Sequence, residues 1–522
     1  MRVGKKTTRR VKGALVAVVA GAMLLAGCGG VDNAAASGEA DPDATLRIMY
    51  GMAASLDPVD AAEPGQLTFS TWPVYDTLLT VGAESTYEPM LATKWEFSAG
   101  GKSLDLTLRD GVTFSDGTPF DAEAVKANLD RYLAADKSGV QLALESVAGV
   151  EVTGDLAVRV NLKRPTTAIL AALASNLGGI MISPKALSSG DLASKPVGTG
   201  AYKIESFKPG EQAVYVRRTD EGAKWDPKTG NVAKVVINRI AGDDAKINAL
   251  KSGQIDLTTL TGDPTVVSEG QAQTVVLDTA LNLVGMYFNP KVKPLDDVKV
   301  RQAINMAIDR EGIVAAFGPN NATRVQPWPK GLPGFEESRE GQYEFDPEAA
   351  KDLLASAGYP DGFTIPGEFL TNNSANIDKI GEVVQANLAD IGIKIELRSM
   401  DILSQVTGYA QGDYAGQFMY MSLPSIDSSS WLQRLFANPI WSPAGTPPEL
   451  TKLMQGVEDP NLSDDERAAK VSEAVQYATD NALYAPLLQG VGGLAASHKV
   501  KGLDDLPAAG GVANLRYLSM TK

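Results

Sequence analysis

The chain has 522 residues, with 63 acidic against 48 basic residues and a formal net charge of −15. That charge argues against a nucleic-acid partner, since a polyanion repels an acidic surface. One histidine, His498, and one cysteine, Cys28, rule out an internal disulfide, most zinc sites and most cysteine-nucleophile arrangements. The length suggests two or three domains.

Residues 1–27 have the parts of a signal peptide: a basic start, then an apolar run from Ala14 to Ala26. The run is shorter than the about 20 apolar residues of a transmembrane helix. LAGC, ending at Cys28, resembles the lipobox of bacterial lipoproteins. That resemblance implies cleavage before Cys28, a lipid on its sulfur, and attachment to the extracytoplasmic, periplasmic side of the cell membrane. Residues 28–44, small and polar after the cysteine, are predicted to be the lipid anchor and a flexible tether.

The first folded segments are predicted after the tether. TLRIMYG, residues 45–51, is typical of a short apolar strand, and a helix is expected over 66–79. Residues 94–111 alternate in hydropathy around Gly100 and its following glycine, which predicts a hairpin. Asp121 is expected to cap a helix that follows this hairpin.

Further along, both helical and strand periods recur. Residues 198–217 read as a second hairpin, turning at Gly210, and 234–257 as strand, helix and strand. Residues 300–314 carry apolar side chains at helical spacing, and 377–397 place a helix, a glycine stop and a strand in a row. These patterns predict a mixed α/β fold.

The familiar catalytic and cofactor motifs are missing. We find no GxSxG elbow, and GGKS at Gly100 lacks the first glycine of a phosphate loop. GTGAYK at Gly198 fails the dinucleotide pattern at its last position, Lys203. We therefore expect no catalytic residue, no cofactor and no metal site, with His498 on the surface. A secreted hydrolase that uses a carboxylate pair stays open, because acidic residues are plentiful.

Six motifs follow one another in a fixed order along the chain. They are SLDP (55–58), LRDGVTFSDGTPFDAEAV (108–125), GTGAYKIESFKPGE (198–211), YFNPKVKPLDDVKVRQAINMAIDREGI (287–313), YEFDPEAAKDLLASAGY (343–359) and ANLADIGIKIELRSMD (386–401). In this order they resemble the extracytoplasmic solute-binding proteins of the peptide/nickel class, family 5, which serve ATP-binding-cassette importers. The likeness runs from about residue 45 to the C-terminus.

This resemblance implies an α/β fold of the periplasmic-binding-protein type (type II, cluster C), with two lobes around a ligand cleft. An extra subdomain would belong to the first lobe, and the hinge would lie near Leu283 and Tyr484. The first lobe would comprise 45–80, 196–282 and 485–522, the extra subdomain 81–195, and the second lobe 283–484. A ligand that touches both lobes would favour the closed form.

The resemblance also implies ligand contacts from two stretches, AAEPGQ (61–66) and FMYMSLPSIDSSSWLQRLF (418–436). With Trp431 fixing the register, Pro424 occupies the position of the aspartate that holds the α-amine in peptide-binding members. A strand over residues 418–424 of the second lobe would place alternate residues on opposite faces. The sequence leaves open which of the two faces lines the cleft. Asn372 would either supply an amide contact or form a turn. The expected ligand-binding residues are Glu63, Gly65, Asn372, Tyr420, Met421, Ser422, Leu423, Asp427 and Trp431.

The sequence thus predicts a lipid-anchored, monomeric binding protein that captures a short peptide or similar small organic solute and delivers it to an importer permease. Because the usual amine anchor is missing, a less charged ligand competes with free peptides. Such ligands include a capped or cyclic peptide, a glycan fragment or a metal chelate.

Overall fold

The computed structural model describes residues 38–60, 64–82, 86–135, 138–188, 190–240, 242–260, 272–317, 321–330, 332–373, 376–422, 427–503, 508–509 and 512–522, with Pro264, Val267 and Leu506 described singly. Gly38–Lys522 forms one compact unit. Cys28 and the predicted signal peptide lie outside the described residues.

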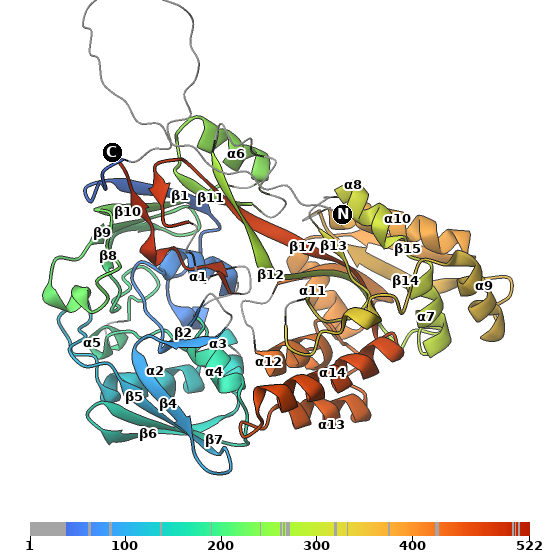
Figure 1. The fold of residues 1–522 in the computed structure, drawn as a ribbon, viewed down its shortest axis with the longest axis horizontal. Helices are drawn as coiled ribbons and strands as arrows, with labels where there is room; N and C mark the ends of the chain where they lie inside the picture. Colours follow the sequence, from blue (N-terminus) through green and yellow to red (C-terminus); the bar gives the residue numbers. More distant parts are fainter. Residues whose placement is uncertain are drawn as a thin grey trace, which may run out of the picture. The chain divides into compact units, whose positions relative to one another are not determined.

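One large mixed sheet runs through this unit (Figure 1). Its strands in spatial order are β15 (Ile393–Ser399), β14 (Phe363–Thr371), β16 (Gly416–Ser422), β12 (Gln273–Phe288), β17 (Tyr484–Ala496), β11 (Leu257–Leu260), β1 (Thr45–Tyr50), β10 (Lys234–Arg239), β9 (Gln212–Arg217) and β8 (Tyr202–Lys208), with β13 (Ala322–Thr323) paired to β17 off this path. β1 is parallel to β10 and β11, and β14 is parallel to β15 and β16. Parallel neighbours need crossover segments, which the intervening helices provide.

Two long strands, β12 and β17, join the two halves of this sheet. β12 pairs with β17 from Gln273 to Tyr287 and with β16 from Asn282 to Phe288, antiparallel in both cases. β17 also pairs with β11 through its other end. Figure 1 shows the two strands side by side, running from the β1 and β11 region into the β14 and β16 region.

A second sheet has four antiparallel strands and α2 packed on it. Its order is β4 (Ala92–Phe97), β5 (Ser103–Leu108), β7 (Ala157–Leu162) and β6 (Val147–Gly154). Gly100 and Gly101 connect β4 to β5 with positive φ angles, which confirms the predicted turn. Asp121 accepts a hydrogen bond from Ala124 N and caps α2, as expected.

Three small two-stranded sheets and the helices complete the structure. The small sheets pair β2 (Leu79–Val81) with β3 (Tyr87–Pro89), β18 (Val500–Lys501) with β21 (Ser519–Met520), and β19 (Ala508–Ala509) with β20 (Val512–Ala513). The helices are α1 (Pro64–Thr71), α2 (Ala122–Ala134), α3 (Gly139–Ala143), α4 (Ala168–Leu173), α5 (Pro184–Leu187), α6 (Asp243–Lys251), α7 (Val298–Met306), α8 (Arg310–Phe317), α9 (Pro347–Ser356), α10 (Ile377–Asp390), α11 (Ile402–Gln411), α12 (Ser428–Leu432), α13 (Pro448–Val457) and α14 (Asp464–Asp480). Short 3₁₀ turns span Pro58–Asp60, Glu221–Lys224, Glu337–Arg339 and Leu515–Tyr517, and a π-helical turn spans Gln433–Ala437.

The buried side chains fall into separate hydrophobic clusters. One surrounds β1 and β10, with Ile48 and Val235 at its centre, and a second fills the four-stranded sheet and α2. The two faces of β12 and β16 carry two more, one under α7 and α10 and one under α12 to α14. Each group of elements therefore has a core of its own.

Two helix predictions need correction. The helix expected over 66–79 ends at Thr71, because Pro73 follows and the residue before a proline disfavours helical geometry. The helical spacing over 300–314 is divided between α7 and α8. Asp309 sits in the break, where it accepts the backbone N–H of Gly312 at 2.8 Å and starts the second helix.

Candidate functional site

The predicted ligand residues begin on α1 and β16. Gly65 lies in the first turn of α1, while Glu63 and Leu423 lie outside the described residues. Ser422 ends β16, and its side chain is not among those described. Tyr420 and Met421 precede it on the same strand.

Tyr420 interacts electrostatically with Tyr50, a tyrosine from the other half of the large sheet. Tyr50 ends β1, is half-buried, and stacks on Phe69 of α1 with ring centroids 3.4 Å apart. Burial raises the pKa of the Tyr50 hydroxyl, a hydrogen bond with Thr259 opposes the rise, and nearby Tyr420 adds to it. Because β16 and β1 lie on opposite sides of β12 and β17 in the sheet, two separate groups of strands contribute to this place.

Tyr50 was missed at the sequence level, although one signal pointed to it. It lies at the carboxyl end of a strand that is parallel to both of its neighbours. Ligands of open α/β sheets bind outside such strand ends.

Met421 and Trp431 lie in a packed core. Both are nearly fully buried, in the cluster that also contains Met419 and Trp328. The indoles of Trp431 and Trp328 meet edge to face with centroids 6.1 Å apart, and Trp431 Nε1 donates to Pro327 O at 3.5 Å. That Met421 and Trp431 contact a ligand stays a prediction, whereas their packing in this core is observed.

Asp427 is a helix cap. Its Oδ1 accepts the backbone N–H of Ser430 at 2.7 Å and the Ser430 hydroxyl at 2.9 Å, at the start of α12. Its Oδ2 accepts the hydroxyl of Thr167, from the turn before α4, at 3.3 Å. Burial raises the pKa of this carboxyl, and the bonds from Ser430 and Thr167 oppose the rise. Asp427 therefore joins two segments that are 260 residues apart.

Asn372 belongs to a buried amide network. It follows β14, and its Nδ2 donates to Gln405 Oε1 at 2.9 Å and approaches the sulfur of Met419 at 3.8 Å. Gln405 Nε2 donates in turn to Phe418 O at 2.9 Å. Asn372 was expected either to contact a ligand or to form a turn. The contacts described for its side-chain amide are with other residues of the protein.

A second polar contact lies near Asp427. Arg164, directly before Pro165, forms an ion pair with Glu458 at the end of α13, whose side chain is 4 % exposed. Gln433 Nε2 donates to the same carboxylate at 2.8 Å. A cavity of ≈ 630 Å³ lies beside this pair. This ion pair was not predicted, since 294 residues separate the two charges in the sequence.

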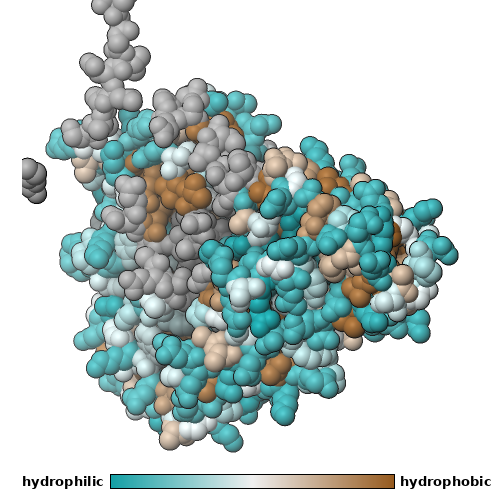
Figure 2. All heavy atoms as spheres, turned by 45° about the vertical axis from the view of Figure 1, so that its right-hand side comes forward, coloured by the Kyte–Doolittle hydropathy of each residue, from teal (hydrophilic) through white to brown (hydrophobic). Residues whose placement is uncertain are grey.

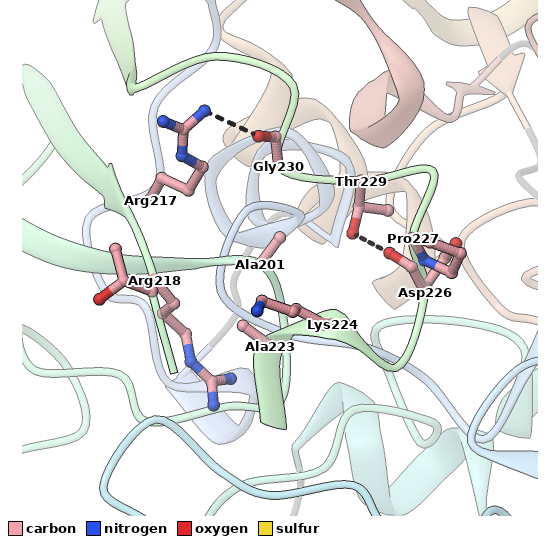
Figure 3. Close-up of a pocket in the computed structure, with 10 residues that line it drawn as sticks. Ala201, Arg217, Arg218, Ala223, Lys224, Asp226, Pro227, Thr229 and Gly230 are labelled. Atoms are coloured by element: carbon pink, nitrogen blue, oxygen red, sulfur yellow. Dashed lines mark hydrogen bonds between the residues drawn. The ribbon is translucent and has the colours of Figure 1, made fainter. Parts of the chain in front are cut away.

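Another cavity lies apart from these residues, beside β8 and β9 (Figure 3). Its volume is ≈ 450 Å³, and Arg217, Arg218 and Lys224 line it together with Asp226. Arg217 donates to Gly230 O at 3.2 Å, and Arg218 is bonded to Asp220 and to backbone carbonyls. These cations already have acceptors in the protein.

The surface and composition of the described residues bear on other kinds of function. On the face in Figure 2, hydrophilic side chains predominate and hydrophobic ones form separate patches. Within the described ranges, no helix is long and apolar enough to cross a membrane. The same residues hold no group of three or more histidine, cysteine, aspartate or glutamate side chains that could bind a metal ion.

Comparison with curated proteins gives several relatives. The glutathione-binding protein GsiB of Salmonella paratyphi A is 30% identical over 404 residues, covering 74% of this chain and 77% of that protein. GsiB of Escherichia coli K12 is 28% identical over 402 residues, with the same two coverages.

Solved structures give the same fold. The periplasmic binding protein DppA of Helicobacter pylori, in complex with the peptide STSA, aligns with a TM-score of 0.76 and 24% identity, over 92% of this chain and 98% of that one. The mixed α/β fold expected from the sequence is therefore confirmed.

The family is shown by a match over much of the chain. The model for bacterial extracellular solute-binding proteins, family 5 Middle, matches residues 86–443. Its members bind solutes and are not enzymes, which removes the alternative of a hydrolase with a carboxylate pair. The chain belongs to the bacterial extracellular solute-binding proteins of family 5.

Proposed function

We propose that this protein is a lipid-anchored binding component of an ATP-binding-cassette importer, which captures a short peptide or a similar small solute and delivers it to the permease. Cys28 would carry the lipid, and residues 28–44 would be the tether. The observation that carries the proposal is that Tyr50 of β1 and Tyr420 of β16, from strands on either side of β12 and β17, lie close enough to interact electrostatically. The family membership supports the same reading.

We propose that the two groups are the lobes of a closing cleft. The boundaries would be those expected from the sequence, with β12 and β17 as the crossings near Leu283 and Tyr484. Asp427 with Thr167, and Arg164 with Glu458, would be contacts between the second lobe and the extra subdomain. A ligand held between the lobes would favour the conformation in which these pairs form.

The ligand proposed is a peptide-like molecule without a requirement for a free amine. Asp427 has both carboxylate oxygens engaged by Ser430 and Thr167, so it is a poor partner for a ligand ammonium. Pro424, at the usual anchor position, carries no charge. The relatives support a peptide-like class, since GsiB binds glutathione and the DppA complex contains a peptide.

The test is thermal unfolding of residues 29–522, which include the whole compact unit, with three probes. These are free-amine peptides of two to eight residues, the same pool N-acetylated, and glutathione. We expect the acetylated pool to raise the melting temperature at least as much as the free pool. At 100 times the dissociation constant, binding adds about 2.7 kcal/mol to the free energy of unfolding.

The other outcomes are equally informative. A shift with the free pool alone would show that an amine is recognised and would contradict the proposed ligand class. No shift with any peptide would reject peptides and turn the search to glycan fragments and metal chelates. Monomeric state would be read from the sedimentation of the same samples.

A further inference from the structure

The cavity of ≈ 630 Å³ beside Arg164 lies between the four-stranded sheet and α13. Its volume is within the range of about 300–1,000 Å³ that is usual for sites of small molecules. One wall consists of Gly100, in the turn between β4 and β5, and of Arg164 and Pro165, which follow β7. The other wall consists of the π-helical turn, α13 and residues that flank α13. Two parts of the chain that are far apart in the sequence therefore form the cavity together.

The two walls touch at the edge of this cavity. Arg164 forms an ion pair with Glu458, and both residues line the cavity. The neighbouring turn also lies against the second wall, because a Cβ atom at Gly101 would be 2.3 Å from Pro460 Cγ. Gly101 has a φ of 67°, a conformation that glycine adopts without strain. These contacts hold the walls together, so a molecule in the cavity can touch both.

The amide side chains of the cavity have hydrogen-bonding capacity to spare. Gln433 Nε2 donates to Glu458 Oε1 at 2.8 Å. Asn461 Nδ2 donates to Asp459 Oδ1 at 2.8 Å. The side-chain oxygens of these two amides accept no bond from the described residues, and the exposed side chain of Gln455, on α13, makes none within the same ranges. An amide can donate two hydrogen bonds and accept two, so all three can bind a further polar group.

The charged side chains of the cavity are already balanced or exposed to water. The guanidinium of Arg164 and the carboxylate of Glu458 neutralise each other. Asp459 is exposed and accepts the backbone and side-chain N–H groups of Asn461 at 2.9 and 2.8 Å, so water and these donors offset its charge. A charged ligand would therefore gain little here. A hydroxyl group both donates and accepts, as the amides do, and needs no opposite charge.

We propose that this cavity binds a small neutral molecule with several hydroxyl groups, of the size of a mono- or disaccharide. The amides would bind its hydroxyls, and Pro165 and Met454 would face its C–H groups. No described residue that was predicted to contact the transported ligand lines the cavity, so this site is distinct from the proposed cleft.

Such a molecule would also act on the proposed cleft. In the proposed function the two walls belong to the extra subdomain and the second lobe, whose contacts form in the closed conformation. A molecule that bridges the walls binds this conformation better and favours it. By linkage, it would raise the affinity of the cleft ligand, and the cleft ligand would raise its affinity by the same factor. This coupling rests on the proposed function, whereas the sugar site does not.

Glucose, maltose and trehalose are the probes for the site. Each is added to residues 29–522 at about 10 mM, far below the concentrations at which sugars stabilise proteins by exclusion from their surface. Saturation-transfer NMR should show transfer from the protein to the protons of at least one sugar. Gln455→Ala should reduce this transfer about fivefold, because it deletes an amide of the cavity without breaking a described contact. The matched control is Gln411→Ala, at the exposed end of α11, which should leave the transfer unchanged.

Three outcomes would overturn the sugar site. The first is the absence of transfer to all three sugars. The second is transfer that Gln455→Ala leaves intact, because the sugar would then be bound elsewhere, for example in the cleft. Putrescine and inorganic phosphate are measured in the same way as charged ligands. If Gln455→Ala weakens the binding of either and no sugar binds, the neutral class is wrong.

The affinity of the tightest peptide of the thermal screen tests the coupling. With the bound sugar present, we expect this peptide to bind about fivefold more tightly, measured by titration calorimetry. An unchanged peptide affinity would show that the sugar site does not control closure and would overturn the coupling. If no peptide binds at all, the proposed ligand class fails, and the NMR result still decides the sugar site.

Discussion

The two places where the halves of this molecule meet are built differently. β12 and β17 share a backbone ladder from Gln273 to Tyr287, buried between other strands. At the junction of α4 with α12 and α13, contact is made by side chains: Thr167 with Asp427, and Arg164 with Glu458. A ladder breaks only when its strands unfold, whereas side-chain pairs can separate and rehydrate at little cost.

In the proposed two-lobe arrangement, the ladder would be the hinge and the side-chain contacts would be a seam. The ladder fixes the path by which the chain crosses between the halves, so motion there is limited to bending. In a proposed open form, the seam pairs would separate and their side chains would become exposed to solvent. In that proposed arrangement, a ligand would decide the balance between open and closed forms.

The largest expected effect comes from breaking the ladder. Met286 is fully buried and pairs with Phe418 on one side and Ala485 on the other. Met286→Pro removes a ladder donor and should lower the free energy of unfolding by more than about 3 kcal/mol, enough to prevent cooperative folding. Urea unfolding followed by circular dichroism measures it. Met286→Leu is the control and should cost less than about 1.5 kcal/mol.

Breaking a contact of the seam should change ligand affinity more than it changes the free energy of unfolding. Arg164→Ala leaves the buried Glu458 carboxylate with Gln433 as its remaining described partner. Because Arg164 is itself 42 % exposed, solvent screens the pair, and we expect about a fivefold loss of affinity for the tightest peptide of the thermal screen. Titration calorimetry measures this change.

The control for that variant lies on the same subdomain. Arg159→Ala breaks the pair with Asp105, at 43 and 47 % exposure, on the four-stranded sheet. It should leave the affinity unchanged. Equal losses in Arg159→Ala and Arg164→Ala would show that the seam has no special role in closure.

Local chemistry explains what the sequence could predict here. The hairpin at Gly100 and the cap at Asp121 depend on neighbours within a few residues, and both were predicted correctly. The helix over 66–79 failed because Pro73 outweighed its apolar spacing. Arg164 and Glu458 meet through the folding of two separate segments, and no spacing rule connects them.

A helix cap that forms neither of the seam pairs separates stability from closure. Ser463 and Glu466 form a reciprocal capping box at the start of α14. Ser463→Ala should lower the free energy of unfolding by about 1 kcal/mol, measured by urea titration, without changing ligand affinity. Ser463→Thr retains the hydroxyl and should restore most of the stability. A change in affinity would mean that α14 takes part in closure.

The smallest expected effect is the pH dependence of stability that comes from the Asp427 carboxylate in the seam. The pKa of Asp427 is raised by burial, so its folded form binds the proton more tightly than the unfolded chain. Stability from this group therefore decreases as pH rises through the folded pKa. Asp427→Asn keeps a side chain that can cap α12. The melting temperature of this variant minus that of the unsubstituted protein should therefore be largest at neutral pH.

Asp105 should give stability the opposite pH dependence. The hydrogen bond from Arg159 lowers the pKa of Asp105, so its contribution is present above the unfolded pKa and lost as pH falls through the folded one. Asp105→Asn should thus lower the melting temperature most at neutral pH and have no effect on it in acid. Melting curves of both variants between about pH 2 and pH 7 should diverge as pH rises, Asp427→Asn upward and Asp105→Asn downward, with the Asp105→Asn change falling at and below the ordinary pKa of 3.8. Parallel curves would contradict the difference between a carboxylate buried in the seam and one paired on an open sheet.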